Sequence, residues 1–293
     1  MTKFSPSESA LQGFRITRAH PVLIFVWSLF LFGALMLAFA VVLMGIGPEF
    51  VSFVKHGGLQ SIDVGNYARI LQNSWLPFIL FLVLGLLVWS TLIAAIYRSI
   101  LRPEDSKFAY LRFGGDEIRL TIVNLALIPF GIISAAVVAA IEGAIGGLTG
   151  IICSFALSAI LIWIGVRLAL ATPMTFAERR IAIFASWRLT RNHFWPLAGM
   201  LVLASIFWLM VWLVCFIISL AAVTIAGGQE MLDHPTTASP VSIITLLVSL
   251  LVQLVLPTLY WVMLASPLAE AYRELRDETA ETAASLRSEP APT

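Results

Sequence analysis

Charged residues are scarce in this sequence of 293 residues. Only 12% of them are Asp, Glu, Lys or Arg, whereas soluble globular domains carry roughly 25%. Hydrophobic residues make up 59%, and the net charge is +1. This composition excludes an ordinary soluble domain, and it also excludes a solvated basic domain that binds nucleic acid.

Cysteine is nearly absent as well. Cys153 and Cys215 are the two cysteines, and each lies inside an apolar run. This predicts small core side chains and excludes a disulfide framework or a cysteine-rich metal site. The strings that mark zinc peptidases, P-loop NTPases and nucleophile-elbow hydrolases are missing too. The sequence therefore predicts no catalytic residue, no metal and no cofactor.

Long apolar runs are what the sequence does have. A helix needs about 20 residues to cross a bilayer, and within lipid it must satisfy its own backbone polar groups. Six runs meet this length: Val22–Gly45, Trp75–Ile96, Leu120–Ile141, Leu148–Ala171, Pro196–Ala226 and Val241–Ala265. We expect an all-α integral membrane domain over residues 1–267, and then a cytoplasmic helical extension and disordered tail over residues 268–293.

The positive charges are distributed on one side of these runs. All but two of the 18 Lys and Arg residues fall in the first segment, in two alternate connections and in the last segment. The exceptions are Lys55 and Arg69. By the positive-inside rule, both termini are expected in the cytoplasm, which for a bacterial protein means insertion in the inner membrane.

Similar entries and exits suggest three parallel helical hairpins, over about residues 1–102, 103–174 and 175–267. The entry "FRITRAHP" at 14–21 resembles "WRLTRNHFWP" at 187–196, and the exit "LATPM" at 170–174 resembles "LASPL" at 264–268. Interfaces favour Arg, Trp and Pro in any case, so the alternative is similarity without duplication.

The arginine-rich pieces have the sequence pattern of helices that lie in the headgroup layer. Ser5 with Glu8, and Thr175 with Glu178, fit capping boxes, and a helix from Thr175 would carry Trp187 and two other apolar residues, Phe176 and Ile183, on one face. We expect contact with lipid headgroups, including anionic ones, from five arginines: Arg15, Arg18, Arg180, Arg188 and Arg191. A plain topology anchor is the alternative. A protein partner or a second copy would bind the same surface.

Three polar residues within or beside the runs form a candidate intramembrane polar site: Asn124, Gln253 and Glu142. Single amides usually form hydrogen bonds between helices. A cavity near Gln253 and Pro257 would instead favour a transporter or lipid translocator. A third alternative is a membrane enzyme at the outer face, using the residues Glu49, His56, Asp63, Glu142, Glu230, Asp233 and His234.

The string "RFGGDE", Arg112 to Glu117, resembles the signature of diguanylate cyclases. That resemblance would imply a nucleotide and metal site in a soluble α/β domain. The connection holds only about 23 residues, far fewer than a domain needs. We expect instead a short helix from Pro103, a turn at Gly114 and Gly115, and Asp116 as the cap of the next helix.

The helix count and the entry "SWRLTRNHFWP" at 186–196 give the chain a further resemblance. It resembles uncharacterised bacterial six-helix inner-membrane proteins and the membrane domain attached to some glycerophosphodiester phosphodiesterases. The catalytic barrel of those enzymes is absent from this sequence, so the resemblance implies a membrane domain without their activity. We therefore expect a non-catalytic protein that organises lipid or a partner through its basic cytoplasmic helices.

Overall fold

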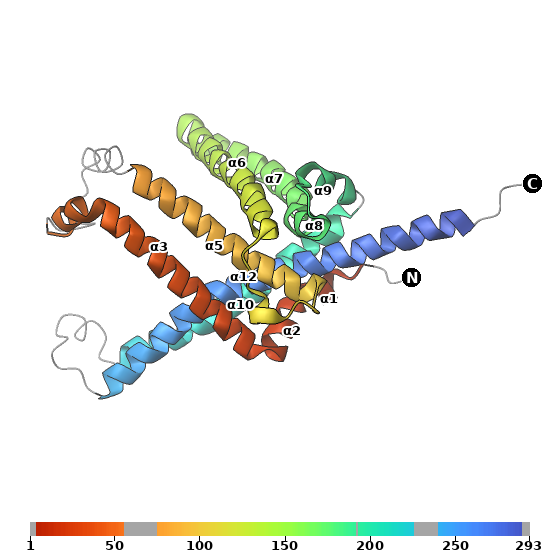
Figure 1. The fold of residues 1–293 in the computed structure, drawn as a ribbon. Coiled ribbons are helices and arrows are strands. Elements are labelled where there is room, and N and C mark those ends of the chain that lie inside the picture. Colours follow the sequence, from red (N-terminus) through yellow and green to blue (C-terminus); the bar gives the residue numbers. More distant parts are fainter. Residues whose placement is uncertain (1–3, 56–74, 192, 226–239, 289–293) are drawn as a thin grey trace, which may run out of the picture.

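The computed structural model describes residues 4–55, 75–191, 193–225 and 240–288, and these are almost entirely helical, without a strand (Figure 1). The order of elements is α1 (Pro6–Ala10), α2 (Gln12–Ala19), α3 (Pro21–Lys55), α5 (Trp75–Leu101), the 3₁₀ turn η2 (Lys107–Tyr110), α6 (Gly115–Ile145), α7 (Gly147–Leu168), α8 (Ala171–Glu178), α9 (Ile183–Leu189), α10 (Phe194–Ile225) and α12 (Pro240–Ser288).

Six of these helices are long and apolar enough to cross a membrane: α3, α5, α6, α7, α10 and α12. They coincide with the six predicted apolar runs. Several of the helices extend beyond the apolar runs, because the polar residues that flank a run can continue the helix. The largest extension is in α12, which passes through Pro257 and Pro267 without a break and ends at Ser288. The helical extension after Pro267 is therefore continuous with the last apolar run. The predicted disordered tail, 288–293, begins at the last residue of α12, and its other residues lie outside the described ones.

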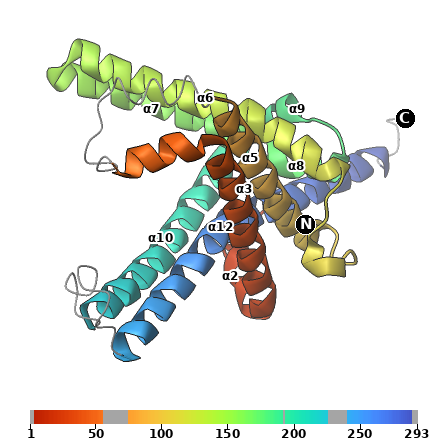
Figure 2. The ribbon, with the colours of Figure 1, turned by 60° about the vertical axis from the view of Figure 1, so that its left-hand side comes forward.

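The long helices pack in three consecutive pairs, α3 with α5, α6 with α7, and α10 with α12. Figures 1 and 2 show the three pairs diverging from a shared region. The helices α5 and α12 occupy this region, since α5 also contacts α6 and α8, and α12 contacts α2, α3, α5 and α8. We call this region, with α1, α2, the α5–α6 connection, α8 and α9, the arginine-rich end.

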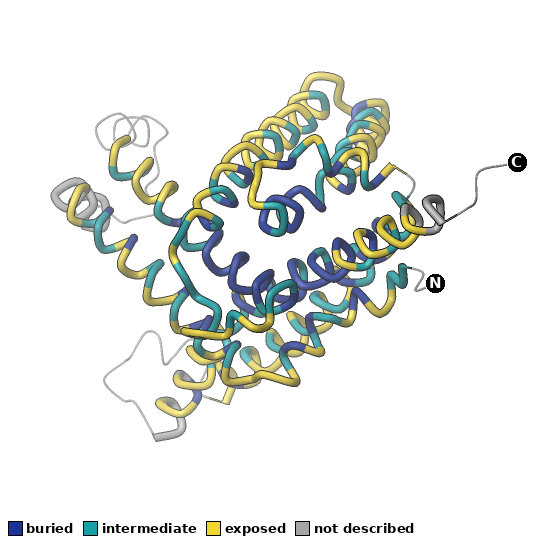
Figure 3. Tube along the Cα trace, turned by 45° about the vertical axis from the view of Figure 1, so that its right-hand side comes forward, coloured by how far each residue is buried: buried dark blue, intermediate teal, exposed yellow. Residues whose placement is uncertain are grey.

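The buried core is concentrated at the arginine-rich end. Trp27, Tyr97 and Phe176 are its largest apolar side chains, and each is almost completely enclosed. Figure 3 shows the buried segments gathered there, while the diverging arms are mostly exposed along their length. Most of the exposed side chains on α6, α7 and α10 are large and apolar. Exposed apolar surface of this extent is consistent with helices that span a membrane.

The first two short helices pack on the last long one. The backbone N–H of Ser5 donates to Glu274 Oε2 at 3.2 Å, and the Ser9 hydroxyl donates to the same oxygen at 3.3 Å. Gly13 lies so close to α12 that a Cβ at this position would be 2.9 Å from Met263 Cα. A larger residue would therefore push α2 away from α12.

The structure corrects the predicted helix after Thr175. Two short helices, α8 and α9, replace it, and Arg179 separates them with a left-handed backbone (φ 54°). Thr175 lies inside α8, where its Oγ1 accepts a hydrogen bond from the Ala182 N–H at 3.2 Å. Phe176 is fully buried instead of facing the headgroup layer with Trp187. Ser5 does precede α1, but its side chain makes no capping hydrogen bond.

Candidate functional site

The acidic residues of "RFGGDE" join α5 to α6 through ion pairs. Glu117, in the first turn of α6, pairs with Arg98 of α5 at 2.5 Å, and their side chains are 1% and 4% exposed. Arg98 also donates to the Tyr110 carbonyl. Arg98 Nη2 donates to Glu117 Oε1, and both side chains are enclosed in the contact between α5 and α6. The role of this motif is therefore to hold α5 and α6 together.

Asp116 extends this network and is not the cap that the sequence predicted. Gly114 is the cap residue of α6, and Asp116 follows it in the first turn. Its carboxylate pairs with Arg102 at 3.2 Å and with Arg119 at 2.8 Å. The guanidinium of Arg102 also lies 4.8 Å from the Phe176 ring centroid, so the network reaches α8. We therefore assign these acidic residues to packing of the arginine-rich end.

The predicted helix from Pro103 is reduced to η2, whose backbone is unusual. Phe108, Ala109 and Tyr110 all have positive φ angles of 54° to 63°. Residues other than glycine rarely adopt this backbone conformation, so neighbouring groups must stabilise it. Trp27 Nε1 donates to the Ala109 carbonyl at 2.8 Å, and Arg98 donates to the next one. The sequence does not indicate this turn, because none of its three positive-φ residues is a glycine.

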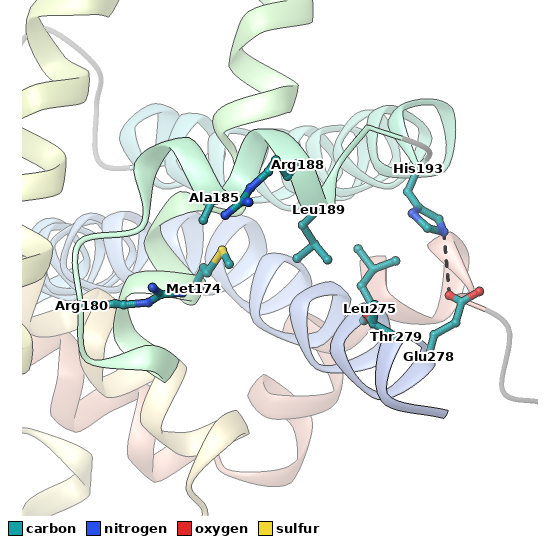
Figure 4. A pocket seen from close by; sticks show the side chains of 9 residues that line it. All are labelled: Met174, Arg180, Ala185, Arg188, Leu189, His193, Leu275, Glu278 and Thr279. Atoms are coloured by element: carbon teal, nitrogen blue, oxygen red, sulfur yellow. Dashed lines mark hydrogen bonds and ion pairs between the residues drawn. The ribbon is translucent and has the colours of Figure 1, made fainter. Parts of the chain in front are cut away.

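A pocket of about 510 Å³ opens between α8, α9 and the last part of α12 (Figure 4). This volume lies within the usual range for small-molecule and cofactor sites. Met174 from α8, Leu189 from α9 and Leu275 from α12 give it apolar walls. Two of the arginines predicted to contact lipid, Arg180 and Arg188, line this pocket.

The charges around the pocket are unevenly compensated. Arg180 Nε pairs with Glu178 Oε2 at 2.6 Å, and His193 Nε2 faces Glu278 Oε2 at 3.9 Å. Arg188 is exposed and has no acidic partner within the described part of the chain. The pocket therefore presents one uncompensated guanidinium beside an apolar wall, which suits a ligand with an anionic group and an apolar part.

A second pocket, of about 330 Å³, lies between α3 and α5. Phe30, Leu87 and Val88 form apolar walls, and Arg112 lies at its rim. Here the arginine pairs with Asp105 at 3.2 Å. This pocket is consequently apolar without a free cation, and it is the weaker candidate for an anionic ligand.

The other predicted headgroup residues lie elsewhere at the arginine-rich end. Arg15 and Arg18 are exposed on α2, and Arg191 is exposed just after α9. None of these three lines the pocket of Arg188. They form an exposed basic surface around the pocket, and their contact with lipid remains a prediction.

The candidate intramembrane polar residues are not brought together. Asn124 of α6 donates through Nδ2 to the Ser90 hydroxyl of α5 at 3.0 Å, so its amide joins two helices. Gln253 and Pro257 are exposed on α12. Glu142 is exposed near the end of α6, where its carbonyl lies 3.3 Å from the position that a Cβ on Gly150 would take. We find no geometry here that would gather a transported solute.

Most residues of the outer-face alternative lie outside the described residues: His56, Asp63, Glu230, Asp233 and His234. Among the residues that the structure does describe, no three His, Cys, Asp or Glu side chains gather as metal ligands. No match to this chain was found among family models, curated proteins or solved structures. The candidate site therefore stands on its geometry alone.

Proposed function

We propose that the chain is a non-catalytic protein of the bacterial inner membrane that binds an anionic lipid at its cytoplasmic surface. In this proposal the six apolar helices are inserted as three hairpins, and the arginine-rich end faces the cytoplasm with both termini. The distribution of Lys and Arg supports this orientation, since all but two of the 18 lie on one side of the apolar runs.

The observation that carries the proposal is the pocket beside Arg188. Its apolar walls from Met174, Leu189 and Leu275 suit the glycerol and upper acyl region of a lipid, and Arg188 and Arg180 suit an anionic headgroup. A guanidinium without an acidic partner gains most from a phosphate, because its planar fork can donate two parallel hydrogen bonds.

The test is lipid binding by the purified full chain in detergent, measured by native mass spectrometry with phosphatidylglycerol as the probe. We expect Arg188→Gln to weaken binding about tenfold, the effect of losing one charge-assisted hydrogen bond. Arg180→Gln should have a smaller effect because Glu178 already compensates that charge.

The matched control is Arg276→Gln. Arg276 lies on α12 beside the pocket but does not line it, and its side chain is exposed and paired with Asp277 at 3.3 Å. The control removes the same charge from the same end of the molecule, so binding should be unchanged. Equal losses in Arg188→Gln and Arg276→Gln would mean that only the net charge attracts lipid, and would refute the pocket as the site.

A further inference from the structure

A second basic group lies on the other side of α9, away from the pocket. Arg167 is the next-to-last residue of α7, and its guanidinium is surrounded by aromatic rings. The guanidinium carbon lies 5.1 Å from the ring centroid of Trp163, 5.6 Å from that of Trp187 and 5.9 Å from that of Phe194. These rings come from α7, α9 and α10, so three helices build the enclosure.

Among the residues that the structure describes, no acidic side chain pairs with the enclosed guanidinium. Its Nε and Nη1 are buried, and within the described ranges neither makes a hydrogen bond. The third nitrogen, Nη2, is not among the enclosed atoms. Aromatic faces attract a cation but accept few of its hydrogen bonds, so a buried guanidinium still favours an anion at its open edge.

The surroundings of that edge favour a phospholipid over a free ion. Trp163 and Trp187 are each more than a third exposed, and Phe184 and Trp195 nearby in sequence are almost fully exposed. Tryptophan prefers the level of the lipid headgroups. Free phosphate would gain nothing from these rings, whereas a phospholipid can place its phosphate against the guanidinium and its apolar part against the rings.

The position of Arg167 is fixed by its backbone as well. Its carbonyl oxygen accepts hydrogen bonds from the Ser186 hydroxyl at 2.8 Å and the Thr190 hydroxyl at 3.3 Å. These two bonds attach α9 to the end of α7. The helix α9 thus separates two basic sites, with Arg188 on the side of the pocket and Trp187 on the side of Arg167.

We infer that Arg167 and its aromatic enclosure form a second lipid site, which binds the phosphate diester of a phospholipid through the guanidinium edge. The inference rests on the proposed insertion in a membrane but not on the pocket beside Arg188. It assigns a specific ligand group to an arginine that the sequence places at a helix end, where snorkelling alone would otherwise account for it.

The experiment uses the full chain in detergent with phosphatidylglycerol, and native mass spectrometry counts the lipids retained. Arg167→Gln should reduce the number of tightly held lipids by one and weaken that site at least about tenfold. Arg167→Lys keeps the charge but loses the planar fork, so its affinity for the lipid should fall between those of the unmodified chain and Arg167→Gln. Inorganic phosphate at millimolar concentration should not displace the lipid.

Two controls separate this inference from the proposed function. Arg188→Gln should remove a different lipid, so the double variant Arg167→Gln/Arg188→Gln should lose two. If Arg167→Gln and Arg167→Lys both retain lipid as the unmodified chain does, the site at Arg167 is refuted while the pocket stands. Displacement by inorganic phosphate would also refute it, because the ligand would then be a free anion.

Discussion

The buried ion pair between Arg98 and Glu117 gives the most demanding test of the fold. Glu117→Ala would leave the Arg98 guanidinium, 4% exposed, without its carboxylate. Removing one partner of a buried pair usually costs about 3–5 kcal/mol. Arg98 would keep its hydrogen bond to the Tyr110 carbonyl and its position 5.5 Å from the Phe176 ring centroid. We therefore expect the lower part of that range, about 3 kcal/mol.

The double variant Arg98→Met/Glu117→Leu separates pairing from burial. It removes both charges, which alone is neutral or stabilising at many buried sites. It also leaves the Tyr110 carbonyl without its donor, at a cost of about 1–3 kcal/mol. The double variant should therefore be at least about 2 kcal/mol more stable than the summed effects of Arg98→Met and Glu117→Leu, each measured alone, predict.

The assay is reversible unfolding in mixed micelles with sodium dodecyl sulfate, followed by far-ultraviolet circular dichroism. Glu104→Ala is the control, since Glu104 is an exposed carboxylate in the same connection, and its loss should change stability by less than about 0.5 kcal/mol. A cost below about 1 kcal/mol for Glu117→Ala, or additive effects in the double variant, would refute the pair as the joint between α5 and α6.

Two further predictions use the same assay. Gly13→Ala should destabilise the chain by about 1–3 kcal/mol through the close contact of α2 with α12. The control Gly131→Ala places a Cβ where nothing lies within 4 Å, so it should stabilise the chain by up to about 1 kcal/mol through helix propensity. Equal effects of the two variants would contradict the contact. Thr175→Val should cost about 1–3 kcal/mol because the buried N–H of Ala182 loses its acceptor, and an unchanged stability would show that another group replaces the hydroxyl.

The long helices could be predicted from the sequence because their signal is local. A run of about 20 apolar residues predicts a helix whatever surrounds it. The short helices at the arginine-rich end were predicted less well, since their ends depend on contacts between distant residues. The break after α8 falls at Arg179, which has a left-handed backbone although it is not a glycine, so the sequence does not indicate the break. Phe176 faces inward because Arg98 and Arg102 lie against its ring.

The candidate site was predictable in part. The sequence indicated Arg180 and Arg188 as a basic surface, but the pocket between them depends on α12 continuing past Pro267 to bring Leu275 alongside. Arg98 follows the apolar run that ends at Ile96, and Glu117 precedes the run that begins at Leu120, so both are placed at the same level of the bundle. Their pairing follows from that placement.

The contact of α1 with α12 has a consequence for biosynthesis. Glu274, which binds Ser5 and Ser9, follows Ser9 by 265 residues. At translation rates of about 5–20 residues per second, the ribosome reaches Glu274 roughly 13–53 seconds after Ser9. The first helices also contact α10, so they dock only after α10 has been made, and their contacts are complete only when α12 follows. Truncated chains that end before α12 should accordingly expose these helices to cellular proteases.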